Sequence, residues 1–303
     1  MKVTPYGVRG SVAAPGPATA RYGGNTSCVR VTGPDGTVLV LDAGTGIRTL
    51  GRELPGELRR VDVLLTHLHM DHIIGLGFFA PLFNPSMEVH IWGPASATLS
   101  LDARLRRYLA PPLFPVLLRD LPCRLELHHT GRGRFSIGAF SVRAARVCHP
   151  GPTVGYRIET EQASLAYLPD HEPALGTHRF PIDAEWTSGF ELAEKVDLLL
   201  HDAQYTRAEY PQHVGWGHST VHHALAFAHL VGARHLVAFH HDPGRDDAAL
   251  ETAIDAAVAD VSPDFPVTPA AEGHTFDLGR ATTGAEPAPP SPPARGRSAH
   301  RPP

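Results

Sequence analysis

The segment that decides the fold is Leu64-Leu65-Thr66-His67-Leu68-His69-Met70-Asp71-His72-Ile73-Ile74-Gly75. Three histidines and one aspartate fall within six residues, directly after the apolar run 61–65. Imidazole nitrogen and carboxylate oxygen are ligands that zinc and its neighbours among the transition metals accept. Surface histidines on a loop are the alternative, because 20 of the 303 residues are histidine. We favour a metal site, since chance rarely places such a cluster at the mouth of a buried strand.

The spacing of these residues indicates where their side chains point. Side chains alternate along an extended segment, so His67, His69 and Asp71 are expected on one side. His72 follows Asp71 directly and, if the chain turns there, faces a second point nearby. One short segment is therefore expected to supply ligands to two metal ions.

The segment resembles the His-x-His-x-Asp-His motif of the metallo-β-lactamase fold superfamily. The resemblance implies an α/β (α+β) fold, a four-layered αβ/βα sandwich with a one- or two-metal site where two β-sheets meet. It extends over nearly the whole chain to about residue 278. The motif is specific for the fold and weak for the substrate, because members hydrolyse lactams, thioesters, lactones, phosphodiesters and RNA.

Length and composition bound the domain organisation. We expect one hydrolase domain over residues 1–278, followed by a disordered tail over 279–303 that is rich in Pro, Ala and Arg. A net charge of −4 does not indicate extensive nucleic-acid binding. Three widely spaced cysteines, no secretory signal and no long apolar run predict a cytoplasmic protein without membrane contact.

The remaining chain alternates predicted strands and helices. Strands are expected at 2–6, 28–32, 38–42, 61–65, 89–94, 125–129, 140–147, 154–160, 164–168, 196–200 and 235–239. Helical patterns are expected at 47–53, 73–83, 99–109, 221–231 and 246–258. Arg9, in a glycine-rich loop, is a candidate for contact with an anion, with a flexible connector as the alternative.

Several polar residues follow predicted strands and complete a metal site. His149 precedes Pro150, Asp170 follows the strand 164–168, and His240 and His241 follow the strand 235–239. The resemblance implies that Asp170 bridges two ions, with His67, His69 and His149 on one and Asp71, His72 and His240 on the other. Alignment to the family pattern favours His240 over His241, although strand alternation leaves both open. We expect two divalent ions, zinc first, with Mn²⁺ or Fe²⁺ as alternatives. Asp42 is expected to order the metal loops, with helix capping as the alternative.

The later motifs suggest the reaction. A hydroxide that bridges two metal ions is a nucleophile at neutral pH, and no covalent-catalysis motif is found in the sequence. His201-Asp202-Ala203 and Gly217-His218-Ser219-Thr220 resemble the ribonuclease Z and cyclic phosphodiesterase branch. That resemblance implies that His218 meets the scissile phosphate or protonates the leaving oxygen, while a helix-capping cluster is the alternative reading. Asp71 is expected to orient the attacking water as well as to bind metal.

We therefore expect a metal-dependent phosphodiesterase that acts on a small or cyclic phosphodiester. The chain has no long, basic, glycine-rich insertion, which disfavours a large RNA substrate. The alternatives are a carbonyl hydrolase of the same fold (a lactonase or thioesterase), a ribonuclease Z-like RNA 3′-end nuclease, and a non-catalytic metal-binding sensor. A homodimer is common among the family's phosphodiesterases, but the sequence locates no interface.

Overall fold

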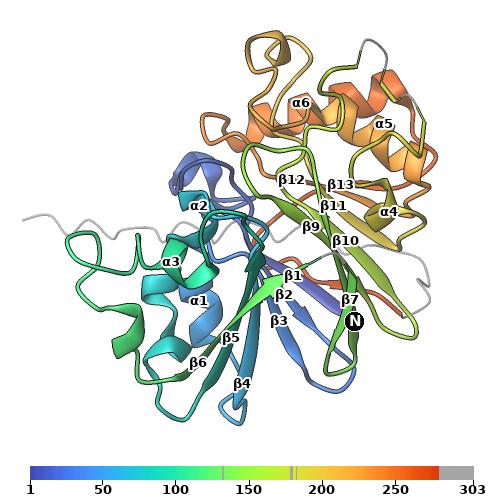
Figure 1. Cartoon of the computed structure of the whole chain (residues 1–303). Helices are drawn as coiled ribbons and strands as arrows, with labels where there is room; N and C mark the ends of the chain where they lie inside the picture. Colours follow the sequence, from blue (N-terminus) through green and yellow to red (C-terminus); the bar gives the residue numbers. More distant parts are fainter. Residues whose placement is uncertain (132, 178–179, 182, 280–303) are drawn as a thin grey trace, which may run out of the picture.

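Two seven-stranded sheets pack face to face in the computed structural model, which describes residues 1–131, 133–177, 180–181 and 183–279 (Figure 1). The first sheet has the strand order β14-β1-β2-β3-β4-β5-β6 and the second the order β13-β12-β11-β10-β9-β8-β7. The strands are β1 Lys2–Gly7, β2 Cys28–Thr32, β3 Val38–Leu41, β4 Arg60–Leu64, β5 Glu88–Pro94, β6 Arg124–Thr130, β7 Gly133–Ile137, β8 Phe140–Arg146, β9 Val154–Glu159, β10 Ser164–Leu168, β11 Leu198–Asp202, β12 Leu236–Phe239, β13 Val267–Pro269 and β14 Phe276–Asp277.

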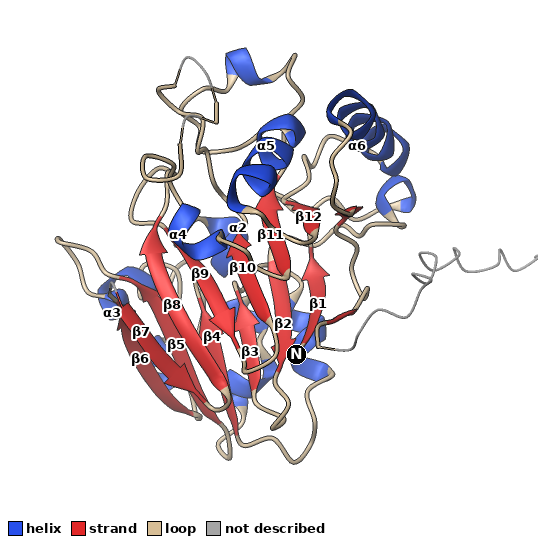
Figure 2. Cartoon of the chain, turned by 90° about the vertical axis from the view of Figure 1, so that its right-hand side faces the viewer, coloured by secondary structure: helices blue, strands red, loops and turns tan. Residues whose placement is uncertain are grey.

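Helices cover the outer face of each sheet (Figures 1 and 2). The first sheet carries α1 Ile47–Arg52, α2 Met70–Ile73, α3 Leu101–Leu105 and short 3₁₀ turns between them, and the second carries α4 Phe190–Ala193, α5 Val221–Val231 and α6 Asp247–Val261. A separate apolar core fills the space between the sheets, where Leu41, Tyr156 and Phe239 are fully buried. These four layers are the predicted αβ/βα sandwich.

The central strands are parallel within each sheet, and this places the functional residues. β3 to β6 pair in parallel in the first sheet, and β10 to β13 pair in parallel in the second. Residues that follow parallel strands lie at the same edge of a sheet. The fully apolar β11 sequence Leu198–Leu200 is typical of such a strand, which is covered on both faces.

Helix α5 shows how local sequence sets the ends of an element. The Thr220 hydroxyl caps its N-terminus by accepting the His223 N–H, and Gly232 ends it in the left-handed conformation at φ 64°. Its buried side chains, Val221, Leu225 and Phe227 among them, face the second sheet. Both ends agree with the helix predicted at 221–231.

Three sequence predictions differ from the structure. The continuous helix expected at 73–83 is wrong: residues 70–83 form α2 and two 3₁₀ turns, because Gly75 lies against the Gly44 carbonyl and Pro81 begins a new turn. The helix expected at 99–109 is shorter, at Leu101–Leu105. Strand β7 was not predicted, because it begins at Gly133, where two nearby glycines indicate a turn. Except for Gly279, the predicted tail lies outside the described residues.

None of the described helices has the length and apolar character needed to cross a membrane.

Candidate metal centre

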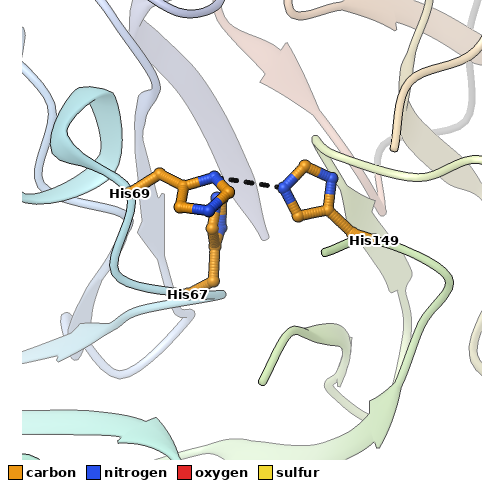
Figure 3. Close-up of side chains that lie close together, drawn as sticks. All are labelled: His67, His69 and His149. Atoms are coloured by element: carbon orange, nitrogen blue, oxygen red, sulfur yellow. Dashed lines mark hydrogen bonds between the residues drawn. The ribbon is translucent and has the colours of Figure 1, made fainter. Parts of the chain in front are cut away.

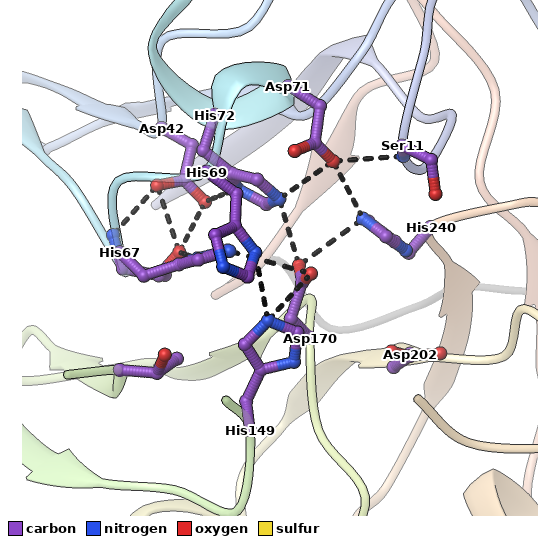
Figure 4. A network of polar contacts seen from close by, with 12 residues as sticks. Ser11, Asp42, His67, His69, Asp71, His72, His149, Asp170, Asp202 and His240 are labelled. Carbon is purple, nitrogen blue, oxygen red and sulfur yellow. Dashed lines mark hydrogen bonds and ion pairs between the residues drawn. The ribbon is translucent and has the colours of Figure 1, made fainter. Parts of the chain in front are cut away.

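Seven predicted ligands come together where the two sheets meet (Figure 4). They come from the loop after β4, from α2, and from the segments that follow β8, β10 and β12. One group contains His67, His69 and His149, and a second contains Asp71, His72, Asp170 and His240. The structure thus brings together all seven residues and divides the histidines as the sequence indicated.

The first group is formed by three imidazoles that face a common point (Figure 3). His69 Nδ1 lies 3.2 Å from His149 Nε2, and the His67 and His149 rings are 4.7 Å apart. The His67 side chain is 2% exposed and that of His149 1%, whereas His69 and Met70 are exposed. The centre therefore opens to solvent beside His69.

Asp170 lies between the two groups, and each of its oxygens faces one of them (Figure 4). Oδ2 is 3.8 Å from Nε2 of both His67 and His149. Oδ1 is 3.0 Å from His72 Nε2 and 3.3 Å from His240 Nε2. A carboxylate placed in this way can bridge two cations.

Asp71 reaches the second group from a helix rather than from an extended segment. His69 is the N-cap of α2, so Asp71 lies in its first turn, and Asp71 Oδ2 is 3.3 Å from His72 Nε2 and 3.4 Å from His240 Nε2. The prediction that Asp71 shares a side with His67 and His69 by strand alternation is therefore wrong. The chain turns one residue earlier than expected, and this turn brings Asp71 and His72 together.

Of the two histidines after β12, His240 faces the candidate centre and His241 faces away from it. His240 Nε2 faces Asp71 and Asp170, whereas His241 Nε2 contacts the Ala270 carbonyl at 2.9 Å, away from the centre. His240 adopts a left-handed backbone with φ 58°, which turns its side chain out of the strand alternation. Burial lowers the pKa of His241 to about 3, so its imidazole is neutral.

The centre has unpartnered atoms that fit divalent cations. His67 Nε2, His72 Nε2 and Asp170 Oδ1 are buried and make no hydrogen bond. A buried polar atom without a partner costs about 1–3 kcal/mol, and one cation in each group would supply the missing partners, the first for His67 and the second for His72 and Asp170 Oδ1. The donor set of imidazoles and carboxylates suits zinc, manganese or iron.

The charges within the centre also suit cation binding. Burial lowers the pKa of His67 well below its ordinary value, so that its imidazole is neutral. Burial alone would raise the pKa of Asp170, but the imidazoles of His240 and His72 hold it well below the usual range. A neutral imidazole and an ionised carboxylate are the forms that coordinate metal.

Three of the candidate ligand histidines have a partner at the ring nitrogen opposite the centre. His72 Nδ1 contacts Asp42 Oδ2 at 2.8 Å, His149 Nδ1 contacts the Gly217 carbonyl at 2.8 Å, and His240 Nδ1 contacts Gln204 Oε1 at 3.1 Å. Such partners fix the ring orientation and direct the other nitrogen to the metal. Gly217 also needs to be glycine: its φ is +91°, and a Cβ would lie 2.2 Å from His149 Nδ1.

Asp42 orders the metal loops, as the sequence suggested. It is fully buried, and its carboxylate accepts the Thr66 N–H at 2.7 Å and the Tyr167 hydroxyl at 3.0 Å in addition to its contact with His72. It does not cap α1, whose N-cap is Gly46. Asp42 thus connects β3, the metal loop after β4, and β10 directly beneath the second group.

We expect Asp42→Asn to weaken both the fold and the metal centre. One amide oxygen cannot accept from Thr66, Tyr167 and His72 together, so the free energy of unfolding should fall by about 2–4 kcal/mol. Metal affinity should fall about 10–100-fold, because His72 loses its carboxylate partner. Urea denaturation and competition with a chromogenic chelator measure the two effects.

Asp62→Asn is the matched control for this prediction. Asp62 is a buried carboxylate on neighbouring β4 that contacts Arg60 and Trp92 outside the metal groups. This variant should lose stability and keep its metal affinity. Equal metal affinity in both variants would contradict the role of Asp42.

His218 lies beside the two metal groups and is paired with a buried aspartate. Its ring is 5.2 Å from that of His149 and 4.9 Å from that of His240, and Nδ1 is 2.7 Å from Asp202 Oδ2. Burial lowers the pKa of His218, but the carboxylates of Asp202, Asp170 and Asp71 outweigh this and raise it to about 9. His218 also falls in two overlapping groups that could hold an ion, although Asp202 already occupies the nitrogen nearest Asp170.

The sequence alone assigned no role to Asp202, whereas the structure shows that it holds His218. Besides His218, it accepts N–H groups from Gln204 and Ser219, each at 3.1 Å, and it is fully buried. The sequence offered two signals for Asp202: its position after a predicted strand, and the resemblance of His201-Asp202-Ala203 to the ribonuclease Z and cyclic phosphodiesterase branch. Gln204 and Tyr167 gave none, because their contacts join segments far apart in the sequence.

One other sequence reading differs from the structure. Arg9 is fully buried, donates to the carbonyls of Gly23, Asp242 and Arg245, and pairs with Asp247, so its guanidinium is not available to an anionic ligand.

Two packed mixed sheets with a His/Asp-rich centre at their shared edge define the class of metallo-β-lactamase-fold proteins. A family model described as the Beta-lactamase superfamily domain matches residues 37–241, and the chain belongs to this superfamily. It is 28% identical over 289 residues to an uncharacterized protein of Mycobacterium tuberculosis, covering 93% of each chain. It is 26% identical over 279 residues to the Ribonuclease Z of Brevibacillus brevis, covering 79% of this chain and 85% of that one. Among solved structures, the metallo-beta-lactamase fold protein YhfI from Bacillus subtilis superposes with a TM-score of 0.66 at 18% identity, covering 91% of this chain and 99% of that one.

Proposed function

We propose that this protein is a metal-dependent phosphodiesterase that acts on a small or cyclic phosphodiester. The observation that carries the proposal is the Asp202–His218 pair beside a centre with ligands for two cations. Phosphodiester hydrolysis needs a proton for the leaving oxygen, and a histidine fixed by a carboxylate can supply it. The similarity to ribonuclease Z, which cleaves phosphodiesters by its name, supports the same class.

The ligand residues have distinct tasks in this proposal. His67, His69 and His149 would hold one ion, Asp71, His72 and His240 would hold the other, and Asp170 would contribute an oxygen to each. Two divalent ions, with zinc as the first candidate and Mn²⁺ or Fe²⁺ as alternatives, would supply Lewis acidity and an activated water at neutral pH.

We assign Asp71 to the attacking water and His218 to the leaving oxygen. The Asp71 carboxylate accepts the Ser11 N–H at 2.9 Å, which fixes it to orient the attacking water. Asp202 holds His218 through Nδ1, so the proton on Nε2 is available for the leaving oxygen. His218 is 11% exposed at the side chain, which gives a substrate access to it while Asp202 stays buried.

A small substrate fits the chain better than a large RNA. The net charge is −4, and the sequence has no long basic insertion that would grip an RNA body. The three cysteines are free thiols, which agrees with the reducing cytoplasm that we propose as the place of the reaction.

The purified, metal-loaded protein should hydrolyse bis(p-nitrophenyl) phosphate, and treatment with a chelator should abolish the activity. The released p-nitrophenolate measures the rate, and restoring the metal should recover it. A protein that holds two ions per chain and leaves this diester intact would overturn the proposal. Lactone and thioester substrates would then test the carbonyl-hydrolase alternative, and RNA with a 3′ trailer would test the nuclease alternative. A protein that hydrolyses none of these substrates would indicate a sensor.

A further inference from the structure

We propose that the loop from Tyr205 to Gly217 forms a substrate subsite for a planar aromatic ring, with Trp216 as the residue that determines specificity. This inference rests on the proposed phosphodiesterase function and deepens it by naming the substrate class. The ring belongs to the leaving-group side of the diester, so the substrates are nucleotides, which carry a base on that side.

A series of ring contacts leads from His218 to the surface. The Tyr205 ring lies 6.0 Å from that of His218, edge to face. The His213 ring stacks on Tyr205 at 4.3 Å with an interplanar angle of 21°, and the Trp216 ring meets His213 edge-on at 4.9 Å. The series begins at the residue that protonates the leaving oxygen and ends at an indole that is 60% exposed.

The backbone places Trp216 beside the metal centre. Gly217 follows it directly, and the Gly217 carbonyl contacts Nδ1 of His149, whose Nε2 faces Asp170. Consecutive Cα atoms are about 3.8 Å apart, so Trp216 is the direct neighbour of the residue whose carbonyl contacts the candidate ligand His149. A substrate whose phosphate lies at the centre can therefore extend its leaving group over this loop.

The loop is held rigid by a buried carboxylate. Glu172 is fully buried and accepts the Tyr210 hydroxyl at 2.8 Å, the Gly215 N–H at 2.9 Å and the Gly217 N–H at 2.7 Å. His213 is fixed separately, through Nδ1 to the Glu209 carbonyl at 2.8 Å. The indole is thus presented on a fixed backbone, which lowers the entropy that a ring must lose on stacking there.

Exposure of the Trp216 indole does not stabilise the fold, but it leaves the ring free to stack on a ligand. A large apolar side chain left in water gains no burial energy, and neighbouring Val214 is also 52% exposed. Aromatic side chains stack on bases through their π-faces, as single-strand binding proteins do. Stacking far from the bonds that change contributes equally to the ground and transition states, so it acts on KM and leaves kcat unchanged.

The test compares two cyclic diesters with the same leaving oxygen. One is adenosine 3′,5′-cyclic phosphate, and the other is methyl riboside 3′,5′-cyclic phosphate, in which a methoxy group replaces the base. Trp216→Ala should raise KM for the nucleotide about tenfold, with kcat within about twofold and the abasic diester unaffected. Trp216→Phe should restore most of the affinity. Trp186→Ala, at an indole that is 76% exposed outside this loop, is the matched control and should change nothing.

A binding measurement separates this inference from the proposed function. Adenosine 5′-monophosphate should quench part of the tryptophan fluorescence of the wild-type protein, and Trp216→Phe should remove that part. If the wild type hydrolyses neither diester while the quenching persists, the proposed function fails and the aromatic subsite stands. Equal effects of Trp216→Ala on both diesters, or no quenching at all, would overturn the subsite. Conversion of a dimer to a monomer by Trp216→Ala, measured by sedimentation, would also overturn it by assigning the indole to an interface between copies.

Discussion

Asp170→Asn should lower phosphodiesterase activity by about 10³-fold or more, which corresponds to at least ~4 kcal/mol of transition-state stabilisation. The reason is geometric. Asp170 is the one residue among the seven whose two oxygens face different groups, Oδ2 toward His67 and His149 and Oδ1 toward His72 and His240. An amide keeps one oxygen acceptor and replaces the other with an N–H₂ donor, so it cannot bridge two cations.

The metal content of this variant should fall together with its activity. We expect about one ion per chain instead of two, measured by elemental analysis after gel filtration, with a circular dichroism spectrum like that of the wild type. Asp102→Asn is the matched control, since Asp102 is an exposed carboxylate on α3 paired with Arg106. Two bound ions and unchanged activity in Asp170→Asn would show that Asp170 does not bridge.

The sequence could locate the candidate metal centre because the candidate ligands follow strand ends. His67 and His149 each come after an apolar or alternating strand, and Asp170 follows a strand of the hairpin at 154–168. Parallel strands collect such residues at one edge, so local patterns are enough to predict that they meet. The fold followed from the same motif, and the helix at 221–231 followed from its cap and its apolar stripe.

The sequence could not predict the features that depend on long-range contacts or on unusual backbone angles. His240 and Asp42 both adopt positive φ angles, which a rule based on strand alternation does not foresee. In a glycine-rich loop, Arg9 was a candidate for contact with an anion. Its guanidinium instead donates to the carbonyls of Asp242 and Arg245, which are 233 and 236 residues away in the sequence. The role of Asp202 became visible only once β11 and the start of α5 lay side by side.

His218→Ala should lower kcat by about 10²–10⁴-fold for a diester with an alkyl leaving group and by less than about tenfold for bis(p-nitrophenyl) phosphate. An alkoxide is a strong base that needs a proton as it departs, whereas p-nitrophenolate leaves without one. The contrast between the two substrates therefore reports proton donation rather than binding. A carbonyl hydrolase that does not use His218 would show no such contrast.

The variant should also keep both metal ions, and this separates the two possible roles of His218. Asp202 Oδ2 lies 2.7 Å from Nδ1, which leaves that nitrogen unavailable to a cation, so removal of the ring should not alter the metal content. Asp202→Asn should lower kcat by a smaller factor than His218→Ala, because His218 stays in place but loses the carboxylate that orients it. Loss of one ion from His218→Ala, together with equal losses on both diesters, would instead assign His218 to the ligand set alongside His149 and Asp170.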